Sequence, residues 1–548
     1  MFSGNQQPFQ PGTAAVPQTQ IELSVACSGL SDRDLSSKSD PCCVLYICEG
    51  AAGAFVELGR TEVVKNSLNP VFATKFQINY KFEEKQLLRF AVLDWDVSVA
   101  SVSRQDALDE LQCSVGEVVA SLGGKFQRRL SGGRGLLLVT AEEVSACRQV
   151  LTLSLSARNL DKKDTFGKSD PFLELSRVNA DGSTTLTHRT EVIKNSLSAD
   201  WRPVTVPLGS LCAGDLRRPV LLRCFDWDND GTHDEIGSVT VPVERLLEPG
   251  CQLKLVNEKK RAKKKKYTDS GTLLVNSARI AQQVTFLDYI QSGTQLHFTV
   301  AVDFTASNGY PTDPRSLHYR DPRGGDNQYM TAIRAVGSII QDYDTDKQFP
   351  CLGFGGRVPP DGRVSHEFFL NGHPSSPYCQ GVDGILQAYY HSLNTVQLYG
   401  PTNFAPVIRH VSRIAASSPP GRDYYVLLII TDGIITDRLD TVAALVDASA
   451  LPLSIIIVGV GSEDFSAMEY LDCDGGRLRD AAGRSAARDV VQFVELLPLL
   501  GRYGLGPETQ AGLARAVLAE LPRQLVEFMQ SHGVTPTTPA PPAAQPVQ

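Results

Sequence analysis

Alternating apolar and polar residues recur along the first half of the chain, with polar turns between the alternating runs. Residues 21–25 read Ile-Glu-Leu-Ser-Val, and residues 151–155 read Leu-Thr-Leu-Ser-Leu. Because the side chains of a strand point alternately to its two faces, this pattern is typical of half-buried strands. Short strands of this kind, joined by polar turns, predict antiparallel β-sandwiches.

Polar motifs of the first half occur twice, about 130 residues apart. The repeated motifs are Lys-Ser-Asp-Pro at residues 38–41 and 168–171, Thr-Glu-Val at residues 61–63 and 190–192, and Asp-Trp-Asp at residues 94–96 and 226–228. Two copies of one unit predict two all-β sandwiches, one at residues 20–140 and one at residues 145–280.

Acidic residues gather in two turns of the second copy. They are Asp164, Asp170, Asp226, Asp228 and Asp234. Asp226 and Asp228 point to the same side of an extended segment, which turns Trp227 toward the core. Carboxylates at one end of a sandwich repel one another unless cations lie among them, and all-oxygen ligands favour calcium. The alternative is two surface turns that are acidic by chance, since Asp is common in turns.

The first copy carries a similar but less regular set of acids. They are Asp34, Asp40, Asp94, Asp96 and Asp106. The third loop is longer than in the second copy, and Asp109 is the alternative to Asp106 as the fifth acid. Residues 97–102 are more apolar than their counterpart, and Ser37 stands where the second copy has Gly167. We therefore expect weaker calcium binding by the first copy.

The segment Leu-x-x-x-Asp-x-x-Gly-Lys-Ser-Asp-Pro, which ends at Pro171, precedes Asp-x-Asp at residues 226–228 and then Asp234. This succession resembles the calcium- and phospholipid-binding C2 domain. The resemblance implies that the five aspartates bind two or three calcium ions in the loops at the sandwich tip. Calcium would then offset the charge by which the tip repels anionic lipid. Phe166, in the acidic loop, is either an apolar wedge for lipid headgroups or a partly buried loop aromatic.

The densest charge run of the chain follows the second set of acids. It is Lys259, Lys260, Arg261, Lys263, Lys264, Lys265 and Lys266. The run lies between strand-like residues 253–256 and 271–275, which predicts an exposed loop of the second sandwich. Basic clusters bind phosphatidylserine or phosphoinositide surfaces. We expect contact with anionic lipid first, with a nuclear-import signal and a merely solvated loop as alternatives.

From residue 282 onward, continuous apolar runs alternate with segments of helical periodicity. The apolar runs, at residues 296–302, 424–430 and 453–458, are typical of buried parallel strands. Helical spacing covers residues 330–343, 384–396 and 404–416, and a C-terminal helix is expected at residues 506–533. This alternation predicts a doubly wound, Rossmann-like α/β sheet at residues 284–505, with its ligand site beyond the carboxyl ends of the strands.

Three polar clusters stand at that predicted edge. Asp303, Thr305 and Ser307 follow one strand, Thr402 precedes a helix, and Asp432 follows another strand. Two carboxylates and three hydroxyls suit a magnesium-type site with a position open for a partner's carboxylate. Each cluster alone is also explained by capping. Together they resemble the metal-ion-dependent adhesion site of the von Willebrand factor A-type domain, which implies bound Mg²⁺ or Mn²⁺.

Two C2 domains followed by an A-type domain is the arrangement of the copines. Asp-Phe-Thr-Ala-Ser-Asn at residues 303–308 and Gly-Pro-Thr-Asn-Phe at residues 400–404 are similar to that family. The resemblance covers about residues 20–533. It implies a calcium-dependent phospholipid-binding protein that moves to anionic membranes. It also implies that the A-type domain recruits intracellular protein targets, in membrane trafficking or signalling.

The composition narrows the class of protein. The chain has 548 residues, of which 42% are hydrophobic and 21% charged, with a net charge of −8. These values are typical of a globular multidomain protein and argue against a specific nucleic-acid partner. No apolar run approaches the ~20 residues of a membrane span. We expect a cytoplasmic protein that moves to the plasma membrane or other membranes when calcium rises, with the nucleus also possible.

Further features of the sequence argue against a metal-binding cysteine motif, a secreted protein and an enzyme. The twelve cysteines lack zinc or redox spacing, and the first residues lack a secretory signal. Residues 1–19 and 534–548 are expected to be disordered tails. An enzyme is not expected, because the chain has no Gly-x-Ser-x-Gly elbow and no complete phosphate loop. The alternative function is a membrane-targeted hydrolase that uses the metal at Asp303.

Overall fold

The computed structural model describes residues 19–32, 38–50, 53–95, 106–132, 135–144, 149–162, 167–179, 182–228, 233–282, 284–472 and 478–537, and of residues 106 and 107 it describes the backbone alone. The chain forms two compact units that do not follow chain order. One unit consists of Met1–Ile21 and Glu143–Val284, and the other of Glu22–Glu142 and Thr285–Gln548. The second sandwich is therefore separate from a unit that holds both the first sandwich and the α/β region.

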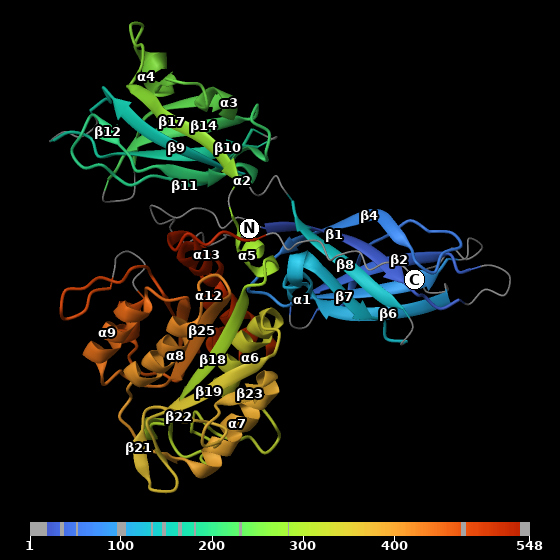
Figure 1. Cartoon of the computed structure of the whole chain (residues 1–548). Coiled ribbons are helices and arrows are strands. Elements are labelled where there is room, and N and C mark those ends of the chain that lie inside the picture. The colour runs from blue at the N-terminus through green and yellow to red at the C-terminus, as the bar shows by residue number, and fades with distance from the viewer. Residues whose placement is uncertain are drawn as a thin grey trace. The chain divides into compact units, whose positions relative to one another are not determined.

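The second sandwich consists of two antiparallel sheets (Figure 1). One sheet has the order β11 (Thr184–Arg189), β10 (Pro171–Val178), β14 (Pro219–Asp226) and β15 (Asp234–Pro242). The other has β12 (Ala199–Asp200), β9 (Gln149–Arg158), β17 (Thr272–Gln282) and β16 (Gln252–Lys254), with β13 (Val204–Pro207) also on β9. The inward faces of both sheets bury Leu153, Leu173 and Leu222, as the alternating pattern predicted.

Two local expectations about this sandwich are wrong. Trp227 is half-buried and does not belong to the core, which is filled by Trp201 instead. β14 ends at Asp226, so the alternation of a strand no longer dictates where Trp227 points. The basic run is not entirely a loop, because it begins as the short helix α4 (Glu258–Lys263). The Asn257 side chain caps this helix by accepting a hydrogen bond from the Lys260 amide at 3.1 Å.

The first sandwich repeats this arrangement. One sheet has the order β4 (Val71–Tyr80), β1 (Thr19–Ser28), β8 (Leu136–Glu143) and β7 (Lys125–Arg129). The other has β3 (Val56–Arg60), β2 (Pro41–Glu49), β5 (Gln86–Asp94) and β6 (Asp106–Ser114). Leu23, Phe90 and Leu137 are fully buried between the sheets. The short helices α1 (Val115–Val119) and η2 (Leu122–Gly124) follow β6.

The α/β region contains a sheet whose main strands are parallel. Its order is β22 (Phe368–Phe369), β19 (Gln348–Phe354), β18 (Gln295–Asp303), β25 (Asp423–Thr431), β26 (Leu453–Gly459) and β27 (Val491–Glu495), with β22 antiparallel at the edge and β23 (Tyr378–Gln380) also on β19. From β18 the chain continues to β19 on one side of it, and the next parallel strand, β25, lies on the other side of β18. β18 is therefore the topological switch point, where ligand sites of doubly wound sheets lie.

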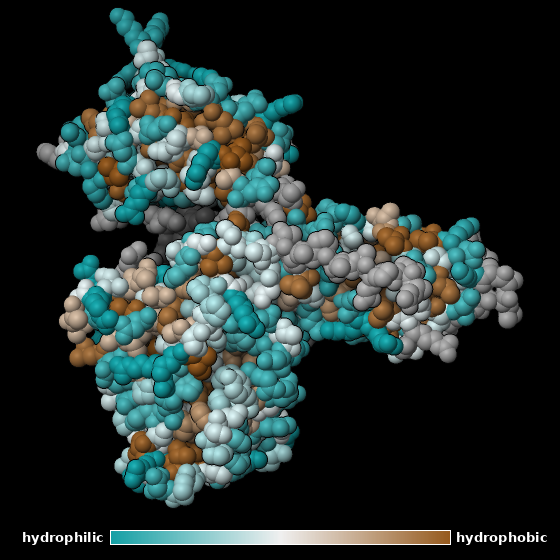
Figure 2. Space-filling view, viewed as in Figure 1, coloured by the Kyte–Doolittle hydropathy of each residue, from teal (hydrophilic) through white to brown (hydrophobic). Residues whose placement is uncertain are grey.

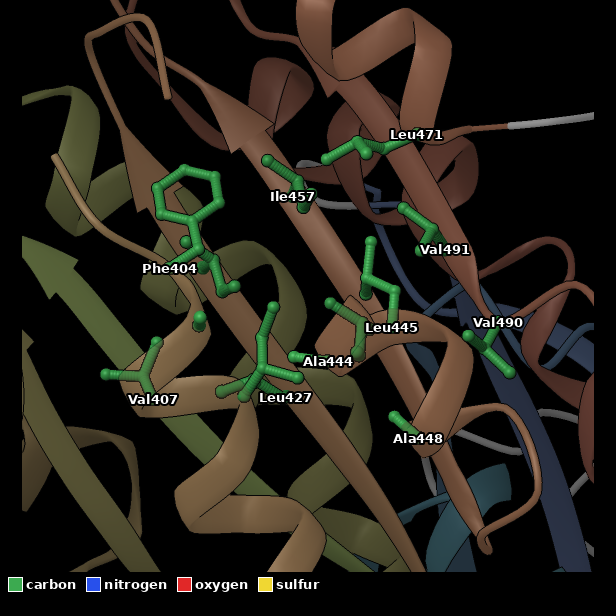
Figure 3. Packing of buried hydrophobic residues seen from close by; sticks show 14 of the residues in the cluster. Phe404, Val407, Leu427, Ala444, Leu445, Ala448, Ile457, Leu471, Val490 and Val491 are labelled. Atoms are coloured by element: carbon green, nitrogen blue, oxygen red, sulfur yellow. The ribbon is translucent and has the colours of Figure 1, made fainter. Parts of the chain in front are cut away.

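Helices cover both faces of this sheet because right-handed crossovers in opposite directions place them on opposite sides. The helices of this region are α6 (Gln328–Ile340), α7 (Gly381–Thr395), α8 (Ala405–Ser417), α9 (Arg438–Ala448), α10 (Ser466–Leu471), α11 (Leu497–Tyr503), α12 (Pro507–Leu518) and α13 (Leu521–Ser531). On one face, Val407 of α8 and Leu445 of α9 pack against Leu427 and Ile457 of the sheet (Figure 3). The doubly wound sheet expected from the sequence is confirmed.

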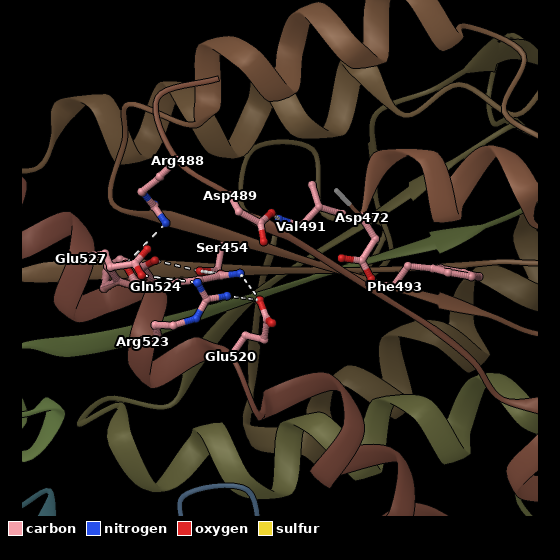
Figure 4. A network of polar contacts seen from close by, with 11 residues as sticks. Ser454, Asp472, Arg488, Asp489, Val491, Phe493, Glu520, Arg523, Gln524 and Glu527 are labelled. Atoms are coloured by element: carbon pink, nitrogen blue, oxygen red, sulfur yellow. Dashed lines mark hydrogen bonds and ion pairs between the residues drawn. The ribbon is translucent and has the colours of Figure 1, made fainter. Parts of the chain in front are cut away.

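The C-terminal helix expected as one piece is two helices, α12 and α13. Pro522 lies in the first turn of α13, where its missing amide hydrogen costs no helical hydrogen bond but would break a continuous helix. A polar network ties α13 to the sheet (Figure 4). In it the Ser454 hydroxyl of β26 donates to Gln524 Oε1 at 2.5 Å, and Gln524 Nε2 donates to Glu520 at 3.3 Å.

Within their compact unit, the first sandwich and the α/β region share buried contacts. The hydroxyls of Tyr80 and Tyr343 lie 2.5 Å apart, and the Ser114 hydroxyl donates to Asp342 Oδ2 at 2.6 Å. Phe82 packs edge-on against Phe286 of α5 (Phe286–Gln291), with 4.9 Å between the ring centroids. Asp342 and Tyr343 belong to the turn η5 (Gln341–Tyr343), which precedes β19 at the amino-terminal edge of the parallel sheet. In the part of the chain that the structure describes, no helix is long and apolar enough to cross a membrane.

Candidate functional site

The tip of the second sandwich is built from the ends of three neighbouring strands. Asp226 is the last residue of β14, and it pairs with Pro171 at the start of β10 and with Asp234 at the start of β15. Because the three strands are hydrogen-bonded side by side, Asp170, Asp226 and Asp234 come together at one end of the sandwich. Asp170 and Asp226 are directly linked, since the Asp170 amide donates to Asp226 Oδ1 at 2.5 Å.

Asp170 is held in place by the loop that follows β11. Its Oδ1 accepts from the Asn195 amide at 2.6 Å, and its Oδ2 accepts from Lys194 Nζ at 2.8 Å. Asn195 has a positive φ of 51°, a conformation that Asn tolerates better than most residues. Burial raises the pKa of Asp170, but the Asn195 amide and the Lys194 ammonium outweigh it, so the pKa is lowered. Asp170 is therefore ionised at neutral pH and ready to act as a ligand.

One carboxylate oxygen of Asp226 has no hydrogen-bond partner among the residues that the structure describes. The residue is 1% exposed, and its Oδ2 accepts no hydrogen bond from the described residues. A buried carboxylate oxygen without a donor is costly, and a cation at the tip would satisfy it. This orphaned oxygen is the observation by which the residues of the tip fit calcium.

The other predicted ligands of the second tip are only partly described. Asp234 is exposed, and the Asp228 amide donates to His233 Nδ1 at 3.1 Å. The His233 ring packs edge-on against Phe172, with 5.1 Å between the ring centroids. Asp164 and Phe166 lie outside the described residues.

The first sandwich has the same scaffold around Asp40 and Asp94. The Asp40 amide donates to Asp94 Oδ1 at 2.7 Å, and the Asn66 amide donates to Asp40 Oδ1 at 2.7 Å. Asn66 has a φ of 56°, close to that of its counterpart Asn195. The repeat in the sequence is therefore a repeat of hydrogen bonds at the tip.

Fewer of the first tip's acids are described. Asp34, Asp96, Ser37 and residues 97–102 lie outside the described residues, and of Asp106 only the backbone is described, opposite Asp94. Asp109, the alternative fifth acid, lies three residues further along β6. Its carboxylate accepts from the Gly132 amide at 2.7 Å and from the Glu110 amide at 2.8 Å, which engages it in a turn.

The basic residues after β16 differ in their contacts. Lys260 Nζ lies 2.7 Å from Asp161 Oδ2, and Arg261 pairs with Glu258 of its own helix at 2.8 Å. The remaining five form no ion pair with any residue that the structure describes; they are Lys259, Lys263, Lys264, Lys265 and Lys266. They are exposed, and the segment projects as a hydrophilic part of the second sandwich (Figure 2). Their charge is available to a partner.

The polar cluster of the α/β region assembles at the carboxyl ends of β18 and β25. Ser307 Oγ donates to Asp432 Oδ1 at 3.1 Å and lies 3.0 Å from Thr305 Oγ1. A Cβ placed on Gly433 would lie 3.5 Å from Thr402 Oγ1 and 4.0 Å from Ser307 Oγ, so Thr402 approaches the same place. The structure thus brings the Ser307 hydroxyl against the Asp432 carboxylate, which lies 125 residues away in the sequence.

Asp303 completes this cluster from the end of β18. Its Oδ1 accepts from the Thr305 amide at 2.8 Å, and its Oδ2 accepts from the Thr431 hydroxyl at 2.6 Å. Burial raises the pKa of Asp303. Burial and the nearby charge of Asp303 raise the pKa of Asp432 to about 7. Two buried carboxylates that oppose each other's ionisation, with hydroxyls around them, fit a hard divalent cation.

His318 supports this site and was missed by the sequence analysis. The ring is fully buried; Nε2 lies 2.9 Å from the Asp303 carbonyl oxygen and Nδ1 lies 2.7 Å from the Tyr389 hydroxyl. Because a carbonyl can only accept, Nε2 carries the hydrogen and Nδ1 accepts from Tyr389. Burial lowers the pKa of His318 to about 3, so the ring is neutral and positions the Asp303 backbone.

No group of three or more His, Cys, Asp or Glu side chains that could hold a metal occurs among the residues described here. The α/β site has two carboxylates and relies on hydroxyls for the rest. At the sandwich tips, three of the predicted aspartates fall outside the described ranges, namely Asp34, Asp96 and Asp164.

Comparison with known protein families shows to which family the chain belongs. The C2 domain family matches residues 22–130 and 149–257, and the Copine family matches residues 316–537. The chain belongs to the copine family. These domains support a calcium-regulated protein that binds phospholipid membranes, and C2 domains generally bind Ca²⁺. In this copine, Asp303, Thr305 and Ser307 precede the matched copine range, whereas Thr402 and Asp432 lie inside it.

Several solved structures match parts of this copine. BON1-C2B is 25% identical, covers 25% of this chain and 94% of its own, and has a TM-score of 0.22. A structure of two C2 domains of Extended-Synaptotagmin 2 is 16% identical, with 51% of this chain and 96% of that chain covered, also at a TM-score of 0.22. TM-scores this low assign neither fold nor function by themselves.

Proposed function

We propose that this copine is a calcium-dependent phospholipid-binding protein that moves to anionic membranes through its tandem C2 domains. The observation that supports this proposal most strongly concerns the tip of the second sandwich. There, Asp170 and Asp226 lie against each other, and Asp226 keeps a buried oxygen that accepts from no donor in the described part of the chain. Paired carboxylates of this kind favour a hard cation with oxygen ligands.

The residues proposed to hold calcium are Asp164, Asp170, Asp226, Asp228 and Asp234 in the second sandwich, and Asp34, Asp40, Asp94, Asp96 and Asp106 in the first. Calcium, when bound, supplies positive charge and coordination positions for lipid oxygens. The chain's own part is orientation: the amides of Asn195 and Asn66 fix Asp170 and Asp40 before any ion arrives. The longer third loop of the first sandwich supports weaker binding there.

The basic segment is proposed to contact the same membrane. Its five lysines without an ion pair among described residues each contribute about 1 kcal/mol of attraction near an anionic surface. Lys260 and Arg261 contribute less, because part of their charge is engaged by Asp161 and Glu258. Phe166 is proposed as an apolar contact with lipid headgroups.

The α/β domain is proposed to recruit intracellular protein partners. Asp303, Thr305, Ser307, Thr402 and Asp432 would hold Mg²⁺ or Mn²⁺. The ion, when bound, supplies a coordination position for a partner's carboxylate. A hydrolase has no comparable support, because the buried His318 ring beside the site is held at both nitrogens and is not free to act as a base. We propose residence in the cytoplasm, movement to the plasma membrane or other membranes when calcium rises, and a role in trafficking or signalling.

Titration calorimetry of calcium binding to the full-length protein tests the proposed calcium site. The proposal expects binding that Asp228→Asn with Asp234→Asn removes from the second sandwich. Absence of calcium binding in the unmodified protein would overturn it.

For the α/β domain, Asp303→Ala is expected to lose metal-dependent capture of partners from cytosol. Retained capture would contradict the proposed role of the metal site.

A further inference from the structure

Lys194 occupies an unusual place at the second tip. Its Nζ lies 2.8 Å from Asp170 Oδ2 and also 3.6 Å from the centroid of the Trp227 ring. The Lys194 side chain is 59% exposed, whereas that of Asp170 is 19% exposed. One lysine thus pairs with a proposed calcium ligand and rests on the aromatic ring between two others, Asp226 and Asp228.

Each oxygen of the Asp170 carboxylate already accepts one hydrogen bond. Oδ1 already accepts from the Asn195 amide, and Oδ2 accepts from the Lys194 ammonium. A calcium ion binds a carboxylate oxygen at about 2.3–2.6 Å. An ion on Oδ2 would therefore lie only a few ångströms from the ammonium, and the two positive charges would repel each other.

The first tip provides an internal comparison. Lys65 stands at the position that corresponds to Lys194, one residue before Asn66. The Asn66 amide holds Asp40 at 2.7 Å, as the Asn195 amide holds Asp170 at 2.6 Å. Lys65, however, pairs with no carboxylate among the described residues. The scaffold is shared, and the ion pair belongs to the second tip.

We propose that Lys194 is a built-in competitor for calcium, which raises the calcium concentration at which the second C2 domain binds the ion. This inference rests on the proposed calcium site. Occupation of Asp170 by calcium releases the ammonium from Oδ2, and the Trp227 ring remains as its nearest support. Since binding free energies are reciprocal, calcium must loosen Lys194 by the same factor by which Lys194 weakens calcium.

Calcium titration of the full-length protein by calorimetry tests this competition. Lys194→Met, which keeps most of the side-chain length and removes the charge, is expected to tighten binding at the second site roughly 1.5-fold to fivefold, as expected for a half-exposed ion pair. Lys194→Arg should stay near the unmodified protein. Lys65→Met should leave the first site unchanged, and Lys168→Met, which removes a nearby exposed charge without an ion pair to a described ligand, should shift the second site less.

Unchanged or weaker binding in Lys194→Met, or an equal shift in Lys168→Met, would overturn the proposal. Absence of calcium binding in every variant would instead refute the calcium site itself, so the two failures are distinguishable. A second readout follows the lysine directly. Labelling of Lys194 by an amine-reactive reagent, quantified by mass spectrometry, should rise with calcium in the unmodified protein. It should not rise in Asp228→Asn with Asp234→Asn, and calcium-independent labelling in the unmodified protein would contradict the competition.

Discussion

At the scale of single residues, the type of a functional side chain could be predicted but its partner often could not. The repeated spacing predicted Asp170, Asp226 and Asp234 as calcium ligands, and the structure places them together at the ends of neighbouring strands. Lys194 was not found, since its contact with Asp170 joins loops 24 residues apart. His318 was missed for a similar reason: its bond to Tyr389 spans 71 residues.

A partly buried histidine at the start of β18 gives a pH-dependent prediction. His297 Nε2 lies 2.8 Å from Asp423 Oδ1, and Nδ1 lies 3.5 Å from Asp344 Oδ2. Burial lowers the pKa of His297, but the two carboxylates outweigh it and raise the pKa to about 9. A raised pKa stabilises the fold fully below the unfolded value of about 6.5, and this stabilisation is lost as the pH rises through about 9.

His297→Gln is therefore expected to lower the free energy of unfolding by about 1–2 kcal/mol near pH 6, a value reduced because the ring is partly exposed. The difference from the unmodified protein should shrink toward about pH 10. Scanning calorimetry of the full-length protein across this range measures it. A difference that is constant with pH would show that the loss comes from packing alone.

At the scale of elements, strands and helices were predicted where periodicity is strong, and their ends were not. The run at residues 453–458 became β26 and the spacing at residues 404–416 became α8, each within one residue. The prediction of a single C-terminal helix was wrong because the helical periodicity continues across Pro522, whereas a helical backbone cannot continue through it. Part of the basic run is helical because Asn257 caps it, a local bond that its charge pattern conceals.

The attachment of α13 to the sheet depends on one buried amide. Gln524 is 2% exposed and joins Ser454 of β26 to Glu520 (Figure 4). Gln524→Ala should lower the free energy of unfolding by about 1–3 kcal/mol, because a buried polar contact is lost and space is left. The exposed Gln530→Ala on the same helix should change it by less than about 0.5 kcal/mol. Equal effects of the two variants on thermal unfolding would contradict the role of this network.

At the scale of the whole molecule, the order of domains could be predicted but not which of them pack together. The first sandwich and the α/β region belong to one compact unit although the second sandwich lies between them in the sequence. Their contacts are made by Tyr80, Ser114 and Tyr343, which look like ordinary core or cap residues in the sequence. Contacts between surfaces distant in sequence leave no periodic signal.

A bulky, charged residue placed at this interface should separate the first sandwich from the α/β region. A Cβ on Gly116 of α1 would lie 3.2 Å from Asp342 Oδ2 and 3.3 Å from the Tyr343 hydroxyl, so Gly116→Glu adds bulk and charge there. Lys85 and Lys347 line one cavity of about 280 Å³ between these elements and should be joined by a short amine-reactive cross-linker in the unmodified protein.

Mass spectrometry of the cross-linked peptides measures the outcome. Gly116→Glu should reduce the Lys85–Lys347 product severalfold, whereas Gly501→Glu should not, because no atom lies within 4 Å of a Cβ at Gly501. A product of equal yield in all three proteins would contradict the shared interface.

The central claim is that the acidic tip of the second sandwich makes membrane binding depend on calcium. Sedimentation of the full-length protein with phosphatidylserine-containing vesicles across a calcium titration tests it most directly. We predict binding that rises with calcium in the unmodified protein and is largely lost in Asp228→Asn with Asp234→Asn. Binding that ignores calcium, or that survives unchanged in this variant, would contradict the account.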